Sequence, residues 1–387
     1  MTDGSIRRLF AYPFRIFFLS AALLAALAVP WWTASVTGAV PVPILPAGHA
    51  HEMLYGFLAA AIAGFLLTAV CRWTDSDPVA GGWLFGLYAL WLLPRLAAAV
   101  GASPLPVQLA ELAFLPLVIL AAAWPIMRVR QWRQLPLLVA LGLFWLCDLA
   151  FHGSGDARWL HGGLLLGALL VVLVGSRITP AFSRNWLRQR GGAADDVADP
   201  GWLAWPLYAV FLLLLAGEAW TILGAAGPPA ALTAVVSLAG AGLLLLRLRY
   251  WRGWRVWREP LLWVLHLGVL AIVPGLVLRG LAALGLVADS AWLHLLGIGA
   301  LAVTILGVMS RVALGHTGRS LVLARGMLVA FSLLLAALAA RVAAALGLFG
   351  WQPAVIASAL TWFMAFALYL WYYSAMLWNP RPDGRPG

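Results

Sequence analysis

The stretch from His49 to Val70 reads H-A-H-E-M-L-Y-G-F-L-A-A-A-I-A-G-F-L-L-T-A-V. From Met53 onward it holds no charged residue. A helix rises about 1.5 Å per residue, so this apolar part is long enough to cross most of a bilayer core of about 30 Å. The stretch therefore predicts a transmembrane helix with two histidines at its start.

The rest of the chain has the same character, since 64% of its residues are hydrophobic and only 10% are charged. This balance suits lipid rather than a soluble core. We therefore expect an all-α fold, a polytopic membrane helix bundle of about twelve transmembrane helices. The expected spans are Phe14–Val36, Met53–Cys71, Trp83–Val100, Val107–Met127, Leu135–Phe151, Leu160–Val174, Trp202–Leu223, Ala230–Leu246, Pro260–Ala282, Trp292–Val312, Val322–Leu346 and Val355–Leu377.

The basic residues predict how these spans are oriented. All 25 are arginine, and they fall at the two termini or in every second loop, with the exception of Arg95, Arg158, Arg279 and Arg341. Loops rich in arginine stay in the cytoplasm, so both termini are expected there. The net charge of +11 then lies at the membrane surface, where anionic lipid head groups are its expected partner. No recognisable nucleic-acid-binding module accompanies it, so no nucleic-acid partner is expected.

One polar, glycine-containing segment, residues 185–200, reads as a cytoplasmic linker between the sixth and seventh spans. It divides the spans into two equal halves. Since the sequence gives no sign of a separate soluble domain, residues 1–387 are expected to form a single integral-membrane domain.

The second, sixth and tenth spans share a pattern. Each begins at the outer face with a histidine (His51, His161 and His294), contains glycines and ends with an arginine. His51 and His294 also precede glycines by the same five and thirteen residues. Because the pattern recurs every four helices, it predicts three four-helix units around a common centre, with these three spans facing one another.

The histidines are the strongest sign of a functional site. Imidazole binds copper, zinc and haem iron, so histidines gathered at the outer face predict a metal or haem site: His49, His51, His152, His161 and His294. His49 and His51 would converge if His49 lay in an extended turn before the helix. Two further histidines toward the cytoplasmic side, His266 and His316, are candidates for a second metal site. The alternative is that single histidines are hydrogen-bonded structural residues.

Charged residues inside the spans add to this prediction. Arg95, Arg279 and Arg341 fall toward the outer face, where exposure to lipid is costly. The planar guanidinium group binds a carboxylate through two hydrogen bonds, so these arginines are candidates for binding haem propionates. In the alternative interpretation, Arg95 pairs with Glu111 and the others reach the interface. The carboxylates of the same region are candidates for proton transfer: Glu52, Glu111, Asp148 and Glu218.

Four motifs resemble those of a known family. They are H-A-H-E-M-L-Y-G-F (His49–Phe57), G-S-R-I-T-P-A-F-S-R-N (Gly175–Asn185), P-L-L-W-V-L-H-L (Pro260–Leu267) and R-V-A-L-G-H-T-G-R (Arg311–Arg319). Together they resemble the NnrS family over nearly the whole chain, with Gly175-Ser176-Arg177 where a Gly-Gly-Arg form is expected. The resemblance implies a bacterial inner-membrane protein that contains haem and copper. It also implies a role in the nitric-oxide response, in tolerance of nitrosative stress and in denitrification.

The number of outer histidines suits one haem b and one copper ion. Covalent haem is not expected, because the sequence holds no Cys-x-x-Cys-His motif. Since His51 and His294 lie on repeat-equivalent spans, they are the expected haem ligands. The copper ligands are then expected to be His49, His152 and His161.

Three classes of function agree with these features. The first is a redox enzyme that binds and removes nitric oxide at the metal centre, with an electron donor that the sequence does not identify. The second is a metal-binding protective or sensor protein without turnover. The third is a transporter, which ranks last because the polar residues gather at one face instead of lining a site at the middle of the membrane. The oligomeric state is left open.

Overall fold

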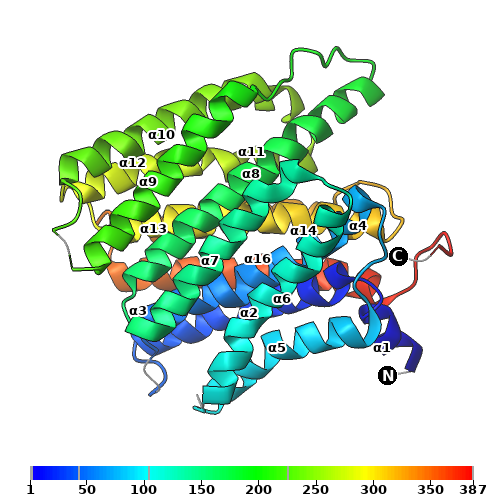
Figure 1. The fold of residues 1–387 in the computed structure, drawn as a ribbon, viewed down its shortest axis with the longest axis horizontal. Helices are drawn as coiled ribbons and strands as arrows, with labels where there is room; N and C mark the ends of the chain where they lie inside the picture. The colour runs from blue at the N-terminus through cyan, green and yellow to red at the C-terminus, as the bar shows by residue number, and fades with distance from the viewer. Residues whose placement is uncertain (1–2, 42–43, 103–104, 225, 386–387) are drawn as a thin grey trace.

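The computed structural model describes residues 3–41, 44–102, 105–224 and 226–385. It is an all-helical bundle, and no strand is present in these residues. Twelve helical segments are long and apolar enough to cross a membrane, which confirms the expected fold class. Figure 1 shows them running side by side, with both termini at one end of the bundle. We call this the termini end and the opposite one the far end.

The first six spans are built from these elements: α2 (Pro13–Val36); α3, η1 and α4 (Pro46–His51, Glu52–Leu58 and Ala59–Thr74); α5 (Gly81–Ala99); α6 (Leu105–Arg128); η2 and α7 (Trp132–Gln134 and Leu135–Ser154); and α8 (Arg158–Gln189). A short helix, α1 (Asp3–Leu9), precedes them. Pro13 and Pro46 stand at helix starts, where the missing N–H costs nothing because the first N–H groups of a helix have no partner within it.

The second six spans are η3 and α9 (Gly201–Leu203 and Ala204–Ile222); α10 (Ala230–Trp251); α11 and α12 (Pro260–Leu270 and Ile272–Ala283); α13, η5 and α14 (Asp289–His294, Leu295–Ala302 and Val303–His316); α15 (Arg325–Ala345); and α16 (Trp351–Trp378). The turn η4 (Gly253–Val256) follows α10. η1 and η5 are π-helical, and each directly follows a histidine, His51 or His294.

The helix contacts agree with three four-helix units. The last helix of each unit packs against the first of the next: α6 against α7, α10 against α12, and α16 against α2. The second, sixth and tenth spans lie at the centre, where 78% of their most apolar residues are buried, against at most 56% in any other span. In that centre η1, α8 and η5 contact one another.

Glycines make this close approach feasible. A Cβ atom added at Gly167 of α8 would lie 3.1 Å from the Leu58 side chain and 3.2 Å from that of Leu301, which belong to the other two central spans. Small residues let transmembrane helices approach closely and gain van der Waals contact. The repeat-equivalent glycines also have equivalent neighbours, since Gly64 packs on Phe18 of α2 and Gly307 on Val264 of α11.

The polar segment after the sixth span differs from the expected linker in extent and in character. α8 continues to Gln189, so the predicted linker 185–200 begins as helix and only residues 190–200 connect α8 to η3. This connection is held in place: the Asp199 carboxylate accepts hydrogen bonds of 2.7 and 2.8 Å from Arg247 and one of 2.8 Å from the Trp251 indole. The side chains of Ala194 and Val197 are also buried.

Candidate functional site

The five histidines predicted for the outer face all lie toward the far end, but the structure divides them into two groups. His51 and His152 lie beside Glu111 and Asp148, and we call these four residues the His–carboxylate cluster. The other three line one cavity, which we call the histidine cavity: His49, His161 and His294. Two separate candidate sites therefore stand where the sequence predicts one cluster of five histidines.

The periodicity of the α-helix explains why the side chains of His49 and His51 lie in different sites. Both residues belong to α3, so His49 is helical and not part of an extended turn. Side chains two residues apart are separated by about 200° around the helix axis, so they point to nearly opposite sides. The two imidazoles therefore diverge, because the extended turn that would let them converge is not present.

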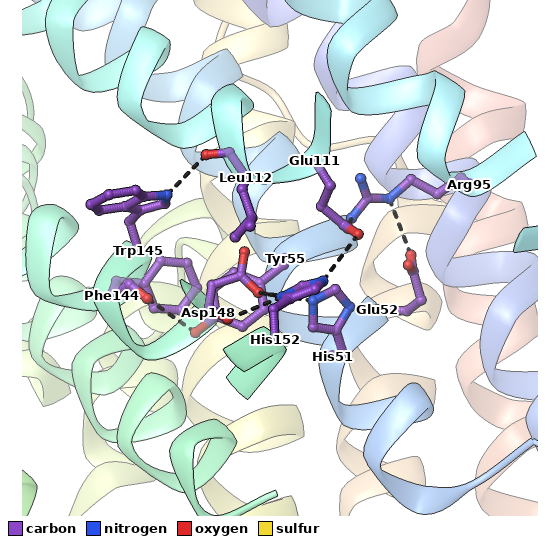
Figure 2. Close-up of polar contacts among 10 residues, drawn as sticks. All are labelled: His51, Glu52, Tyr55, Arg95, Glu111, Leu112, Phe144, Trp145, Asp148 and His152. Carbon is purple, nitrogen blue, oxygen red and sulfur yellow. Dashed lines mark hydrogen bonds and ion pairs between the residues drawn. The ribbon is translucent and has the colours of Figure 1, made fainter. Parts of the chain in front are cut away.

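Asp148 is the anchor of the His–carboxylate cluster. Its side chain is 2% exposed, and Oδ1 lies 2.9 Å from His51 Nε2 and 3.2 Å from His152 Nδ1 (Figure 2). Asp148 and His152 are one turn apart on α7, where His152 Nδ1 also lies 3.0 Å from the Asp148 carbonyl oxygen. An ionised carboxylate only accepts hydrogen bonds, so Asp148 fixes the orientation of both imidazoles.

Arg95 fixes the second carboxylate. Its guanidinium donates to Glu111 Oε1 at 2.7 Å and to Glu52 Oε2 at 3.2 Å (Figure 2). The other Glu111 oxygen, Oε2, lies 3.8 Å from His152 Nε2. Arg95 thus pairs with Glu111, as in the alternative interpretation of the sequence.

These contacts leave a compact set of metal ligands. His51, Glu111 and His152 each offer one ligand atom, and the three atoms lie within 4.8 Å of one another. No other such group of three occurs in the residues that the structure describes. Two imidazoles and a carboxylate can coordinate a single transition-metal ion.

The histidine cavity is wider. It has a volume of about 420 Å³, and aliphatic and aromatic side chains make up most of its lining. The three imidazoles come from the three central spans, since His49 lies on α3, His161 on α8 and His294 on α13. Their ligand atoms do not form a compact group like that of the cluster. They surround a space for a molecule larger than one ion.

Neighbouring groups orient the imidazoles of the cavity. His294 Nδ1 lies 2.7 Å from the Ser290 carbonyl oxygen and must donate to it, which leaves Nε2 as the unprotonated nitrogen. The Trp32 ring stacks on His49 at 4.3 Å between centroids. The edge of Trp292 meets His161 at 5.5 Å. A backbone carbonyl at the second nitrogen is a common support for a metal-binding histidine.

The far-end arginines differ in their partners. Arg279 donates to Glu218 Oε1 at 2.7 Å, and Arg158 binds Asp156, whose pKa it holds below the usual value. Arg341 lines the histidine cavity with its guanidinium 5.9 Å from the Trp32 ring, and it forms no hydrogen bond or ion pair with a described residue. Of the three arginines predicted to bind haem propionates, Arg341 alone is thus left without a carboxylate partner in the described part of the chain.

The two histidines predicted for an inner site have different neighbours. His266 Nε2 lies 3.1 Å from Ser183 Oγ, and its ring lines another cavity of about 970 Å³. The His316 ring lies 5.4 Å from that of Phe14. Neither belongs to a group of three metal ligands in the described residues, and His316 does not line the cavity that His266 lines.

Some features of the site have no clear signal in the sequence. The π-helical segments η1 and η5 follow His51 and His294, and such wide turns often occur at functional sites. The equal spacing from these histidines to their glycines is the one trace of them in the sequence. Trp32 and Thr33 also line the cavity, but each resembles an ordinary residue of an apolar span.

Comparison with known proteins agrees with this architecture and with the motifs. No curated protein matches the chain. A family model described as NnrS protein matches residues 8–381, which include all twelve spans and both candidate sites. The chain therefore belongs to the NnrS family, the nitric-oxide-response membrane proteins whose motifs the sequence contains.

Proposed function

We propose that this protein binds haem in the histidine cavity and copper in the His–carboxylate cluster, and that it uses these centres to bind and remove nitric oxide. The observation that carries the proposal is the cavity itself, an apolar space bordered by three imidazoles from the three central spans. Membership of the NnrS family supports a role in the nitric-oxide response.

The size and chemistry of the cavity suit haem. Cofactor sites are mostly apolar, have volumes of about 300–1,000 Å³ and contain few polar groups. The histidine cavity meets these conditions, and its lining includes no acidic residue. His294 would be the first candidate to bind the haem iron, since its ring is already oriented through Nδ1. His161 and His49 are the candidates for a second ligand.

The compact cluster suits a single copper ion instead. His51 and His152 offer imidazole nitrogens and Glu111 an oxygen, a donor set that fits copper. Asp148 would orient both histidines by accepting a hydrogen bond from each ring, and Arg95 would orient Glu111 through their ion pair. This arrangement differs from the sequence-based one, in which His51 and His294 share one haem, because the two histidines belong to different groups.

Haem iron and Cu(I) each supply a coordination position that binds nitric oxide. The protein contributes orientation and a dry environment. The Ser290 carbonyl and the Trp32 ring fix two of the imidazoles, and the apolar lining excludes water. Nitric oxide is small and neutral, so it can reach such a site through the lipid without a polar channel. Glu52 accepts a hydrogen bond from Arg95 beside the His–carboxylate cluster, and Glu218 accepts one from Arg279, which lies over the Trp292 ring next to His161. Both are candidates for proton transfer.

A nitric-oxide electrode tests this function. We expect the purified protein, supplied with a chemical electron donor, to consume nitric oxide steadily and to change its haem spectrum when the gas is added. Uptake of a fixed, stoichiometric amount would instead indicate a protective or sensor protein. The His316→Ala variant is a suitable control, because that ring packs against Phe14 away from both sites. If the loaded protein gives neither a spectral change nor uptake, the proposal is wrong.

The proposed location is the bacterial inner membrane, with both termini in the cytoplasm. Figure 1 places the two termini at the same end of the bundle, and the arginine-rich loops favour the cytoplasm for that end. We expect cytoplasmic reporters fused after Gly191 or after Gly387 to be active. A periplasmic reporter fused after Gly227 should be active as well. A periplasmic signal from the Gly191 fusion would reverse the orientation and place both sites at the cytoplasmic face.

A further inference from the structure

Three residues that line the histidine cavity carry hydrogen-bond donors without a hydrogen-bond partner in the described residues. Trp32, Thr33 and Arg341 all line the cavity, and their side chains are buried, with exposures of 7%, 6% and 8%. Trp32 Nε1 and Thr33 Oγ1 have no hydrogen-bond partner in the described residues. The Arg341 guanidinium lies over the Trp32 ring, and it forms no hydrogen bond or ion pair with any described residue. Thr33 follows Trp32 in α2, and Arg341 lies over the Trp32 ring, so we call these three residues the donor corner.

Such a corner is costly in an apolar bundle. A buried polar group without a partner destabilises the fold, and a buried charge without a counter-charge does so more strongly. The other far-end arginines avoid this cost, since Arg95, Arg158 and Arg279 each bind a carboxylate. The lining of the cavity includes no Asp or Glu that could form an ion pair with Arg341. The missing partner is therefore expected to come from a ligand.

The chemistry of the corner specifies that ligand. A guanidinium and an indole N–H only donate hydrogen bonds, and a threonine hydroxyl can donate as well. A cation would be repelled by Arg341, and a neutral acceptor would leave its charge uncompensated. The planar guanidinium fork matches two oxygens held in one plane. A carboxylate, or a planar oxyanion of similar shape, satisfies all of these conditions.

We propose that Trp32, Thr33 and Arg341 form an anion subsite inside the histidine cavity. Its ligand is a carboxylate or a planar oxyanion, which binds the Arg341 fork with Trp32 Nε1 and Thr33 Oγ1 as further donors. The subsite rests on the proposed function in so far as the same cavity holds haem. Two sources provide this chemistry: a carboxylate arm of the haem, or a free ion such as nitrite.

Haem binding to full-length protein purified from haem-starved cells distinguishes the two sources. We expect the Arg341→Gln variant to bind haemin about tenfold to hundredfold more weakly, as for loss of a charged hydrogen bond. The variant and the wild type should bind haemin dimethyl ester, in which both carboxylates are blocked, with equal affinity. Arg325→Gln is the matched control, because Arg325 begins the same helix, α15, as an exposed residue. Thr33→Val should weaken haemin binding about threefold to tenfold.

Nitrite provides the second arm of the experiment. If a free oxyanion is the ligand, nitrite will raise the melting temperature of the haem-free wild type but not that of Arg341→Gln, and haemin affinity will be equal in both. The subsite is overturned if Arg341→Gln changes neither haemin nor nitrite binding. Failure of the wild type to bind haemin or its ester would contradict the proposed function, while the nitrite arm would still test the subsite.

The stability of the ligand-free protein separates a binding role from a structural one. An unpaired buried charge does not stabilise the fold, and its removal is neutral or stabilising. We therefore expect haem-free Arg341→Gln to melt at the same temperature as the wild type or higher. A clear decrease would mean that Arg341 supports the fold, and the anion subsite would be wrong.

Discussion

Replacement of His294 by alanine is expected to remove haem from the purified protein and to leave its copper content unchanged. His294 lines the wide cavity, and its Nε2 is the nitrogen free to bind iron. Without the His294 imidazole, haem would lose a ligand to its iron, and the haem absorbance should be almost absent. The measurement is the haem spectrum and the copper content per polypeptide. His316→Ala should keep both.

The opposite result is expected for the His–carboxylate cluster. His152→Ala should remove copper and keep haem, because His152 belongs to the compact group of ligands and does not line the cavity. Asp148→Asn should reduce copper affinity by about tenfold to a hundredfold, since the Asp148 carboxylate orients the two imidazoles through its contacts with His51 and His152. If His51→Ala loses haem and His294→Ala loses copper, the division between the two sites is wrong.

The second large effect concerns stability at the segment between α8 and η3. Asp199→Ala should reduce the free energy of unfolding by about 3 kcal/mol, the lower end of the range for removing the partner of a buried charge, since Asp199 itself is partly exposed. The Arg247 side chain is only 2% exposed, and without Asp199 its charge stays buried and uncompensated. The Trp251 indole would lose its acceptor as well. Thermal unfolding in detergent measures this change.

Two variants make that test specific. Asp195→Ala removes a partner of Arg188 in a pair whose side chains are 59% and 93% exposed, and surface pairs of this kind contribute about 0–1 kcal/mol. It should leave the melting temperature nearly unchanged. Adding Arg247→Leu to Asp199→Ala should recover much of the lost stability, because it removes the unpaired charge. A double variant as unstable as Asp199→Ala alone would contradict this explanation.

The prediction from sequence succeeds where the signal is local. Apolar runs fix the twelve spans, because a helix in lipid satisfies its own backbone hydrogen bonds whatever its neighbours are. The pattern of His51, His161 and His294 also predicts the central position of their spans, since the repeat carries packing information in its glycines. The extent of α8 is missed, because its last turns are polar and resemble a loop in composition.

The membrane fold, the three central spans and the gathering of five histidines toward one end of the bundle could all be predicted from the sequence. Each of these follows from hydropathy, helical rise and repeat spacing, which are properties of the chain read in order. Which histidines share a site depends instead on how the helices pack in three dimensions. His49 and His51 are only two residues apart, yet they lie on opposite sides of α3. His49 therefore lines the cavity, and His51 contacts Asp148.

The tertiary structure likewise decided that Arg95 and Arg279 have carboxylate partners and that Arg341 has none in the described residues. In the sequence these arginines are alike, because each is a charge near the end of an apolar span. Their partners come from other helices, so they are set by how the helices pack. Packing acts between residues far apart in the chain, and for that reason the composition and spacing within one span do not contain it.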